Sequence, residues 1–446
     1  MNVTEPDGVE GAVVKVVGMT GRIIISILLL LPSLLWGQSA LTPEDPPQQR
    51  RCGHYEYIEM LTEQDPEFPA RRAALEEEMN RWIMENAEII NSESSSVITI
   101  PVVVHILYFN HIQNIPHSRV IEQIDRLNKD FRRLNSNLSG IPAAFAHLVA
   151  DVEFEFCLAR RDPQGNWTNG VTRRQVSQPS FTYHDDHIIK STSQGGQSIW
   201  NPARYLNIWV VNLTGGVLGY AQPPGGNATT DGIVIGYRFF GSTGASPPFN
   251  HGRTTVHEVG HWFNLIHIWG DDNGACWGSD LVHDTPNQAS EFYGCPTFPQ
   301  MDICTPDSPG VMFMNYMDYV NDDCMMMFTH GQKARMLAAL NVFRPGLKNS
   351  NGCKPAINVE EIPDLSSLSV FPNPGNGLFR FELIMNTDAE IHLTVVNSLG
   401  QTVWDDNLGV RQSVYETIDL QHLAPGFYYL SVSAGGSRTT QKLIIQ

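Results

Sequence analysis

The sequence has little positive charge. Its 446 residues include 29 Lys and Arg against 47 Asp and Glu, which gives a formal net charge of −18 at pH 7. Such a chain would repel the phosphates of nucleic acid, so the composition argues against a nucleic-acid partner. The acidity identifies no other partner. A hydrophobic fraction of 42% indicates folded structure, and the length predicts two or three folded units.

The sequence also lacks an apolar run long enough for a transmembrane helix. The most apolar stretch, residues 23–35, follows Arg22 and is too short and too close to the N-terminus to span a bilayer. It is typical of a secretory signal peptide, which we place at residues 1–37, with Met19 as an alternative translation start. The sequence therefore predicts an exported protein with no transmembrane segment.

The seven cysteines include no Cys-x-x-Cys pair. A zinc site made of the four cysteines between residues 276 and 324 is therefore the weaker hypothesis, and disulfides are expected in an exported chain. An odd number leaves one cysteine unpaired. We take this to be Cys52, because it lies just after the expected signal peptide.

The chain does contain a zinc-binding pattern, His-Glu-x-x-His, which begins at His257. On a helix, His257 and His261 lie one turn apart on the same face, so both can bind one Zn²⁺ at about 2.0–2.1 Å. Glu258 can take a proton from a zinc-bound water, whose pKa the metal lowers to about 7. His267 would be the third ligand after a sharp turn near Asn264, because Asn tolerates the left-handed backbone. Three ligands leave a fourth position open, as hydrolysis requires.

Composition and patterning divide the rest of the chain into segments. Residues 38–96 are rich in Pro and Glu, with a helix expected at 69–88, and are typical of a propeptide rather than a packed domain. Residues 97–354 form the expected protease domain. Its predicted elements are a strand at 97–107, a helix at 118–134, strands at 152–158, 206–211 and 231–239, and a helix at 329–341. We expect the strand at 231–239 to be the sheet edge above the cleft.

Among the histidines outside the zinc pattern, we expect His105, His111 and His251 to be structural or surface residues. After Cys353 and a linker at 355–368, short alternating strands punctuated by Gly, Pro and Asn indicate a separate all-β sandwich at 369–446.

A second motif, Met-Asn-Tyr-Met-Asp-Tyr at residues 314–319, follows the zinc pattern by about fifty residues, as the Met-turn does in metzincin proteases. Together the two motifs resemble the pappalysin family, and the likeness covers about residues 98–353. The resemblance implies an α/β (α+β) metzincin-type catalytic domain. In it, His257, His261 and His267 would bind zinc and Glu258 would be the general base and acid.

The same resemblance assigns roles to two Met-turn residues. Met317 would form the hydrophobic floor beneath the metal. Tyr319 would stabilise the oxyanion, with a core tyrosine as the alternative. The sequence departs from the metzincin pattern at Asn264, where that pattern has Gly, but Asn can adopt the same backbone geometry.

The resemblance also implies a substrate preference. In similar enzymes an Asp at the position of Asp322 lies at the bottom of the pocket for the residue after the scissile bond, which implies cleavage N-terminal to Arg or Lys. A solvated acidic face is the alternative. With that preference, Arg71, Arg72 and Arg81 would be candidate self-processing sites.

Latency and calcium binding follow from the resemblance as well. The Cys52 thiolate would occupy the open zinc position of a zymogen, with an unpaired or dimer-forming thiol as the alternative. Structural Ca²⁺ would bind near Asp280, Asp284 and Thr285, where turn-forming side chains are the alternative. The implied disulfides are Cys276–Cys304 and Cys295–Cys324, and Cys157–Cys353 remains by elimination.

Three segments of the C-terminal sandwich, residues 369–377, 395–401 and 423–429, resemble the sorting domain of bacterial type IX secretion cargo. The alternative is a substrate-binding or spacer module. The resemblance implies the type IX machinery as a partner and a protein released from, or attached to, the bacterial surface. The overall prediction is a secreted zinc endopeptidase acting on proteins or peptides. The alternative is an inactive surface adhesin, against which the intact Glu258 argues.

Overall fold

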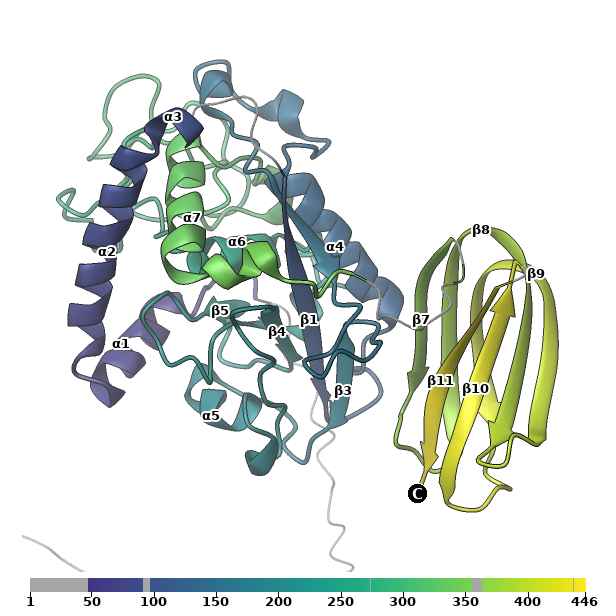
Figure 1. Ribbon diagram of the computed structural model, residues 1–446. Helices are drawn as coiled ribbons and strands as arrows, with labels where there is room; N and C mark the ends of the chain where they lie inside the picture. The colour runs from purple at the N-terminus through teal and green to yellow at the C-terminus, as the bar shows by residue number, and fades with distance from the viewer. Residues whose placement is uncertain (1–46, 91–96, 273, 355–361, 363, 436) are drawn as a thin grey trace, which may run out of the picture. The chain divides into compact units, whose positions relative to one another are not determined.

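The structure is a computed structural model that describes residues 47–90, 97–272, 274–354, 362, 364–435 and 437–446 (Figure 1). The expected signal peptide at residues 1–37 lies outside the described residues, as does most of the expected linker. Within the described ranges, no helix is long and apolar enough to cross a membrane.

The N-terminal segment forms three helices, α1 (His54–Gln64), α2 (Phe68–Glu85) and α3 (Ala87–Ile90). The predicted helix at 69–88 corresponds to α2, whereas α1 was not predicted. The expectation that this segment is not packed is wrong, because Tyr57, Phe68 and Met79 are fully or almost fully buried. Each of these three residues directly follows a glutamate, so the sequence pattern gives little sign of burial. Helix α2 lies beside α7 (His330–Phe343) (Figure 1).

The catalytic segment is built on a six-stranded sheet. Its strands are β1 (Ile98–Tyr108), β2 (Phe154–Leu158), β3 (Val171–Gln175), β4 (Leu206–Val211), β5 (Gly219–Ala221) and β6 (Ile233–Gly236). The order is β2-β1-β4-β6-β5, and β3 pairs with the second half of β1. All pairings are parallel except that of β5 with β6. Residues 100–107 of β1 are buried throughout, which explains why they are apolar apart from His105.

The sheet edge differs from the prediction. Strand β6, within the expected edge segment 231–239, is an inner strand, and the edge strand is the antiparallel β5. A strand as short as β5 carries no period-two pattern, so the sequence did not reveal it. The consequence is functional, because the outer edge of β5 lies beside the zinc pattern. A Cβ added at Gly219 would lie 3.0 Å from Cγ of Glu258.

The two faces of the sheet carry separate hydrophobic clusters. One face, with Ile106, Ile208 and Ile235, packs against α4 (His117–Phe131) and α6 (Arg253–Trp262). The other face, with Trp209 and Tyr220 among its members, packs against residues of α1. The remaining short elements are α5 (Asp186–Ile189), η1 (Leu138–Gly140), η2 (Ala146–Leu148), η3 (Tyr183–Asp185), η4 (Thr192–Gln194), η5 (Tyr237–Phe239), η6 (Asp322–Cys324) and η7 (Pro345–Asn349).

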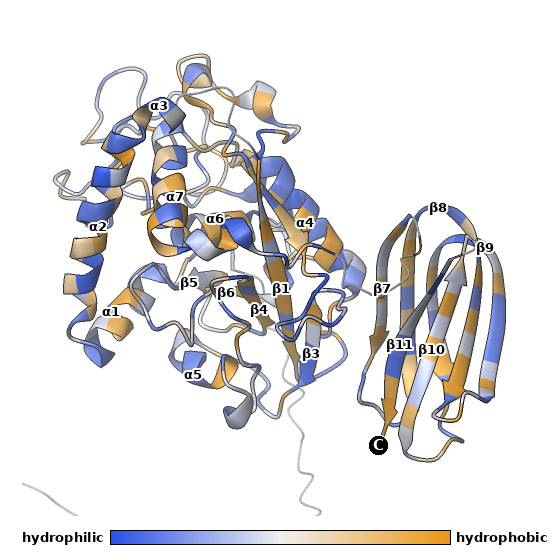
Figure 2. Ribbon diagram, in the orientation of Figure 1, coloured by the Kyte–Doolittle hydropathy of each residue, from blue (hydrophilic) through white to orange (hydrophobic). Residues whose placement is uncertain are grey.

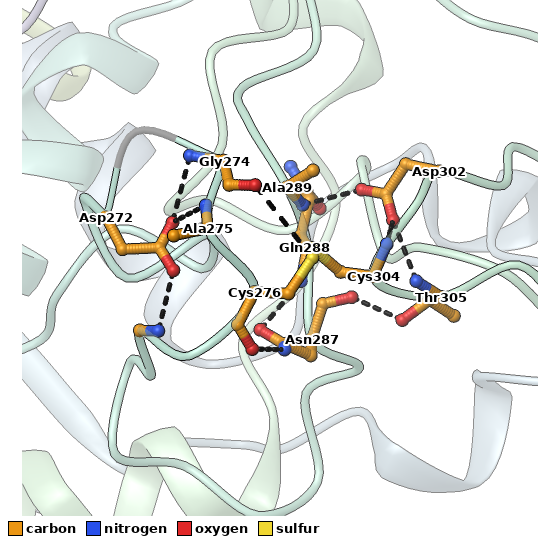
Figure 3. Close-up of a disulfide and its surroundings, with 11 residues drawn as sticks. Asp272, Gly274, Ala275, Cys276, Asn287, Gln288, Ala289, Asp302, Cys304 and Thr305 are labelled. Atoms are coloured by element: carbon orange, nitrogen blue, oxygen red, sulfur yellow. Dashed lines mark hydrogen bonds between the residues drawn. A yellow bond between two sulfur atoms is a disulfide. The ribbon is translucent and has the colours of Figure 1, made fainter.

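Three disulfides join the pairs that the sequence analysis expects, Cys157–Cys353, Cys276–Cys304 and Cys295–Cys324. The last two staple the long segment between α6 and α7, and Figure 3 shows the Cys276–Cys304 bridge among the side chains that hold its loops. There, Asp302 accepts hydrogen bonds from the backbone N–H groups of Ala289, Cys304 and Thr305. Crosslinking loops of this length stabilises the fold by about 3 kcal/mol each in the chain-entropy model.

The C-terminal segment contains five antiparallel strands around a separate apolar core. They are β7 (Leu365–Phe371), β8 (Leu378–Asn397), β9 (Thr402–Asp419), β10 (Gly426–Ala434) and β11 (Ser437–Ile445). Long β8 pairs with β7 near its start and with β10 near its end, so it belongs to both layers of a sandwich. Apolar and polar residues alternate along these strands (Figure 2), as an all-β sandwich requires.

Candidate active site

The imidazoles of the zinc pattern converge on one point. His257 and His261 project from α6, all of whose residues are buried, and His267 follows a turn at Asn264. Asn264 has φ +67°, the left-handed conformation that the pattern predicts. Nε2 of His261 lies 3.1 Å from Nε2 of His257 and 3.1 Å from Nε2 of His267. Tetrahedral ligands with bonds of 2.0–2.1 Å would lie about 3.3 Å apart, so this spacing fits one zinc ion.

The other ring nitrogens explain why Nε2 faces the centre. Nδ1 of His257 bonds the carbonyl of Tyr316 at 2.7 Å, Nδ1 of His261 that of Leu265 at 2.8 Å, and Nδ1 of His267 an oxygen of Asp271 at 2.8 Å. With Nδ1–H donating to these oxygens, each Nε2 presents a lone pair to its neighbours. Burial lowers the pKa of His257 and His261 well below the usual range, which favours the neutral form that binds metal. The donor set therefore fits a cation.

Glu258 and Met317 complete the surroundings of this centre. The carboxyl of Glu258 is buried beside the edge strand β5, and this desolvation raises its pKa to about 8. Met317 lies under α6, and a Cβ added at Gly260 would meet its Sδ at 2.6 Å. Glycine at position 260 thus lets the Met-turn approach the helix between the two histidines.

Comparisons with known proteins agree with this geometry. Residues 190–341 match the profile of a family described as pregnancy-associated plasma protein-A. An extracellular metalloprotease of Arthroderma benhamiae is 30% identical over 264 residues, which cover 58% of this chain and 83% of that protein. The chain belongs to the pappalysin family. It is a secreted zinc metalloendopeptidase made as a zymogen.

Solved structures of mirolysin are also similar to this chain. A promirolysin mutant of Tannerella forsythia is 44% identical, with a TM-score of 0.62, over 69% of this chain and 99% of that one. Mature mirolysin in complex with a cleaved peptide is 50% identical, with a TM-score of 0.56, over 57% of this chain and 96% of that one. Residues 369–446 match the profile of a secretion system C-terminal sorting domain. Secretion is therefore supported by both parts of the chain.

Cys52 of this pappalysin lies in the active site. Its Sγ and one nitrogen from each of the three histidines lie within 4.8 Å of one another, and Sγ is 3.4 Å from Oε2 of Glu258. Burial raises the pKa of the thiol well above its usual value. The backbone around Cys52 extends the sheet: Gly53 donates to the carbonyl of Gly219 at 2.9 Å, and Cys52 pairs with Gly219 in a parallel bridge.

Tyr319 faces the same centre rather than a remote core. Its ring centroid is 5.0 Å from that of His267, and its hydroxyl accepts a hydrogen bond from the Cys52 backbone N–H at 3.2 Å. The Tyr319 hydroxyl is thus hydrogen-bonded to the N-terminal segment. The sequence analysis did not identify His54, whose ring stacks on His261 with centroids 3.8 Å apart. No motif in the sequence singles out that histidine.

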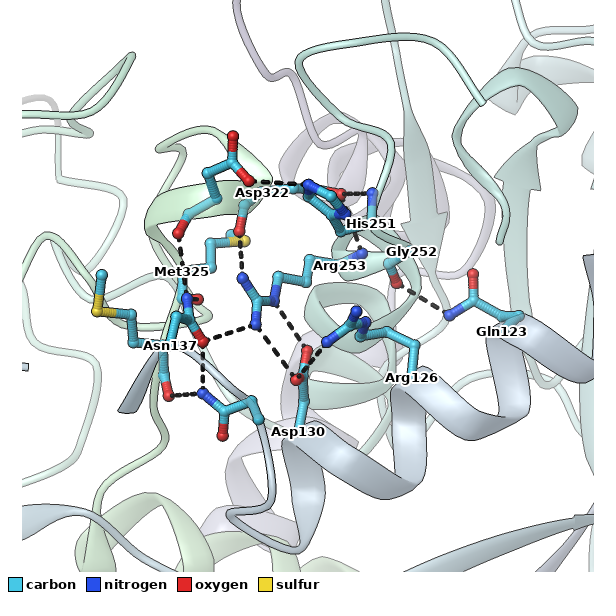
Figure 4. Close-up of polar contacts among 12 residues, drawn as sticks. Gln123, Arg126, Asp130, Asn137, His251, Gly252, Arg253, Asp322 and Met325 are labelled. Carbon is cyan, nitrogen blue, oxygen red and sulfur yellow. Dashed lines mark hydrogen bonds and ion pairs between the residues drawn. The ribbon is translucent and has the colours of Figure 1, made fainter. Parts of the chain in front are cut away.

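Asp322 is fully buried, which contradicts the alternative of a solvated face. Its Oδ2 accepts from the backbone N–H of His251 at 2.7 Å and of Arg253 at 3.3 Å, as the surroundings in Figure 4 illustrate. Its Oδ1 lies 2.5 Å from Nη2 of Arg50, whose side chain is 1% exposed. Arg253 anchors this loop, because it donates to the Asp322 carbonyl and pairs with Asp130 at 3.0 Å. The sequence analysis did not identify Arg50 or Arg253.

The candidate calcium ligands Asp280, Asp284 and Thr285 make hydrogen bonds within the protein. Asp280 is buried and accepts from the Thr285 hydroxyl at 2.7 Å and from the Val282 N–H at 3.1 Å. Asp284 accepts from the Thr329 hydroxyl at 2.7 Å and the Gly331 N–H at 2.9 Å, at the start of α7. These are turn and capping contacts, and they agree with the alternative of turn-forming side chains. Burial raises the pKa of Asp280 to about 7.

Proposed function

We propose that His257, His261 and His267 hold the catalytic zinc through Nε2 and that Glu258 is the general base and acid. The observation that carries this assignment is the convergence of three Nε2 lone pairs beside the Glu258 carboxyl. When bound, zinc supplies Lewis-acid polarisation and a water acidic enough to react near neutral pH. Glu258 takes the proton from the attacking water and passes it to the leaving amine. The Tyr319 hydroxyl donates a hydrogen bond to the oxyanion of the substrate carbonyl.

The proposed specificity is cleavage N-terminal to Arg or Lys. It is supported by Arg50, a basic residue of the N-terminal segment that already fills the space in front of Asp322. Its guanidinium also donates to the Thr254 hydroxyl at 3.1 Å and the Val320 carbonyl at 3.3 Å. A substrate Arg could make the same set of bonds, whereas an apolar side chain would leave Asp322 buried without a cation.

The proposed latency device is the segment that contains Arg50 and Cys52. Cys52 sits at the fourth position of the metal centre and its backbone bonds Tyr319 and β5, so a substrate has no access. Cys52→Ser in the precursor should raise activity before processing, because a serine hydroxyl is a weaker zinc ligand than a thiolate. If the Cys52→Ser precursor is no more active than the wild-type precursor, Cys52 is a buried thiol without a role in latency.

Three further assignments belong to the same proposal. Asp280, Asp284 and Thr285 are offered as calcium ligands, because a divalent cation would offset the cost of burying the Asp280 charge. The domain limits are a signal peptide at 1–37, a propeptide at 38–96, the protease at 97–354, a linker at 355–368 and the sorting domain at 369–446. The type IX secretion machinery of a bacterium is the partner of that last domain.

Cleavage-site mapping on a denatured protein mixture tests the central assignment, with enzyme processed to near Val97 and Glu258→Ala as control. We expect cuts by the intact enzyme only, before Arg and Lys. Cuts before apolar residues would retain the protease and discard the role of Asp322. No cuts by a folded, zinc-loaded sample would favour the alternative of a binding protein.

A further inference from the structure

Another residue of the N-terminal segment, Tyr57, is buried against the catalytic domain without taking part in the metal centre. Tyr57, on α1, is 0% exposed. Its hydroxyl donates to Oδ2 of Asp186 at 2.9 Å and lies 3.4 Å from Oε1 of Gln222. Its ring centroid is 4.8 Å from that of Tyr220. Neither catalysis nor binding of the thiol to zinc requires these contacts.

Tyr57 is buried in a pocket formed by residues of the catalytic domain. We call it the phenol pocket, and its residues are Asp186, Lys190, Trp209, Tyr220 and Gln222. Asp186 also accepts from the Tyr220 hydroxyl at 2.8 Å and pairs with Nζ of Lys190 at 2.8 Å. Nζ of Lys190 lies 5.2 Å from the ring centroid of Trp209 and 5.6 Å from that of Tyr220. None of these contacts involves Tyr57, so we expect the pocket to persist when the N-terminal segment is removed.

The phenol pocket adjoins the edge where an extended chain pairs with the sheet. Tyr220 belongs to β5, and its neighbour Gly219 pairs with Cys52 on the face that carries the metal centre. Directly opposite residues share a face of a sheet, and successive residues alternate between faces. A chain residue opposite Tyr220 therefore places its side chain on the face where Tyr57 lies.

The path of the N-terminal segment places the pocket relative to the scissile bond. The segment runs from Arg50 at Asp322, past Cys52 at the histidines, to Tyr57 in the phenol pocket. The phenol pocket and Asp322 thus lie on opposite sides of the metal centre along this path. Because Asp322 is the proposed site for the residue after the scissile bond, the phenol pocket faces residues before that bond.

We propose that the mature protease uses the phenol pocket as a subsite for a tyrosine side chain of the substrate, on the N-terminal side of the scissile bond. This inference rests on the proposed function. The pocket selects a ring by its aromatic walls and a hydroxyl donor by the Asp186 carboxylate and the Gln222 carbonyl oxygen. Lys190 disfavours Arg and Lys there by charge repulsion.

The test uses mature enzyme released from the full-length precursor and a series of quenched fluorescent peptides. Each peptide has Arg after the scissile bond and Tyr, Phe or Ala at one of the four preceding positions. At one position we expect Tyr to raise kcat/KM about tenfold over Phe, the effect of one hydrogen bond to a charged acceptor. Equal rates for Tyr and Phe at every position would overturn the proposal. Hydrolysis of none of the peptides would instead overturn the proposed function.

A matched pair of variants tests whether the preference for Tyr over Phe arises in the phenol pocket. Asp186→Asn should reduce the Tyr-to-Phe ratio to below about threefold. Asp185→Asn should keep the ratio, because that neighbouring carboxylate bonds Thr182 and not the pocket. If Asp186→Asn does not fold, N-acetyltyrosinamide and N-acetylphenylalaninamide are compared as inhibitors of the unmodified mature enzyme, and equal inhibition by the two would contradict the subsite. Faster activation of a Tyr57→Phe precursor without any tyrosine preference in the mature enzyme would restrict the pocket to latency and overturn the proposal.

Discussion

The contact of Arg50 with Asp322 gives a quantitative prediction about latency. The two side chains are 1% and 0% exposed, and the guanidinium makes its three bonds to Asp322, Thr254 and Val320. Breaking a buried ion pair by removing one partner costs about 3–5 kcal/mol. Asp322 retains two backbone N–H donors in the Arg50→Met precursor, so we expect the lower end of that range. About 3 kcal/mol corresponds to a roughly 150-fold increase in the fraction of open precursor.

The assay is the initial rate at which intact precursor hydrolyses a short fluorogenic peptide, with mass spectrometry confirming that the chain is uncleaved. Arg51→Met is the matched control. Arg51 is half exposed and pairs with Glu56 at 2.7 Å, a surface pair worth about 1 kcal/mol or less. Equal increases for the two variants would refute the reasoning. Asp322→Asn should also open the precursor, and combining it with Arg50→Met should open it little further, since both remove the same pair. Because Asp322 is also the proposed specificity residue, opening of these variants is measured by alkylation of the Cys52 thiol and not by peptide hydrolysis.

Three other predictions concern catalysis, backbone and pH. Tyr319→Phe should lower kcat by about 10²-fold with little change in KM, because it removes one oxyanion donor; an unchanged kcat would make Tyr319 structural. Asn264→Val should lower the thermal midpoint more than Asn264→Gly does, since a β-branched residue is strained at φ +67°; equal losses would contradict this interpretation. His105 should contribute to acid lability. Burial lowers its pKa to about 4, so the folded chain binds fewer protons than the unfolded chain between about pH 4 and 6.5, and stability falls as pH falls through that window. The loss is about 3 kcal/mol, and His105→Gln should reduce the slope of unfolding free energy against pH measured with urea; an unchanged slope would exclude His105 as its source.

The sequence predicts those parts of the site whose residues lie close together along the chain. The helix places His257 and His261 together through its own geometry, and the left-handed turn at Asn264 follows from residue type. Strand β4 matches its predicted bounds, because a parallel strand buried on both faces gives a continuous apolar run. Helix α4 is also confirmed, with Val120, Leu127 and Phe131 on its buried face.

The parts that sequence reasoning missed depend on contacts between distant residues. Arg50 and Asp322 are 272 positions apart, and a basic residue gives no local sign that it will be buried. Helix α1 begins after a glycine and has a weak apolar stripe, since few of its side chains, Tyr57 and Met60 among them, are buried against the catalytic domain. Strand β5 is too short for a pattern, although it lies beside Glu258 and pairs with the segment around Cys52.

Three buried points of the N-terminal segment, Arg50, Cys52 and Tyr57, have a consequence for activation. Of the candidate processing sites on α2, Arg81 is exposed, whereas Arg71 is paired with Asp65. A cut before Arg81 would leave all three points on the released side of the chain. The fragment would also keep Glu76, which pairs with Arg335, so it would remain bound without a covalent link.

Cleavage and activity should therefore separate in time. Before the cut, the segment rebinds as part of the same chain; after it, rebinding depends on concentration. We expect a lag between the cleavage seen by mass spectrometry and the rise in peptide hydrolysis, and a larger final activity after dilution. Arg50→Met should shorten the lag more than Arg51→Met does, because only the first removes a buried anchor. Activity that rises in step with cleavage at every protein concentration would mean that the cut itself dismantles the anchors, for instance by unwinding α2 and withdrawing Glu76 from Arg335.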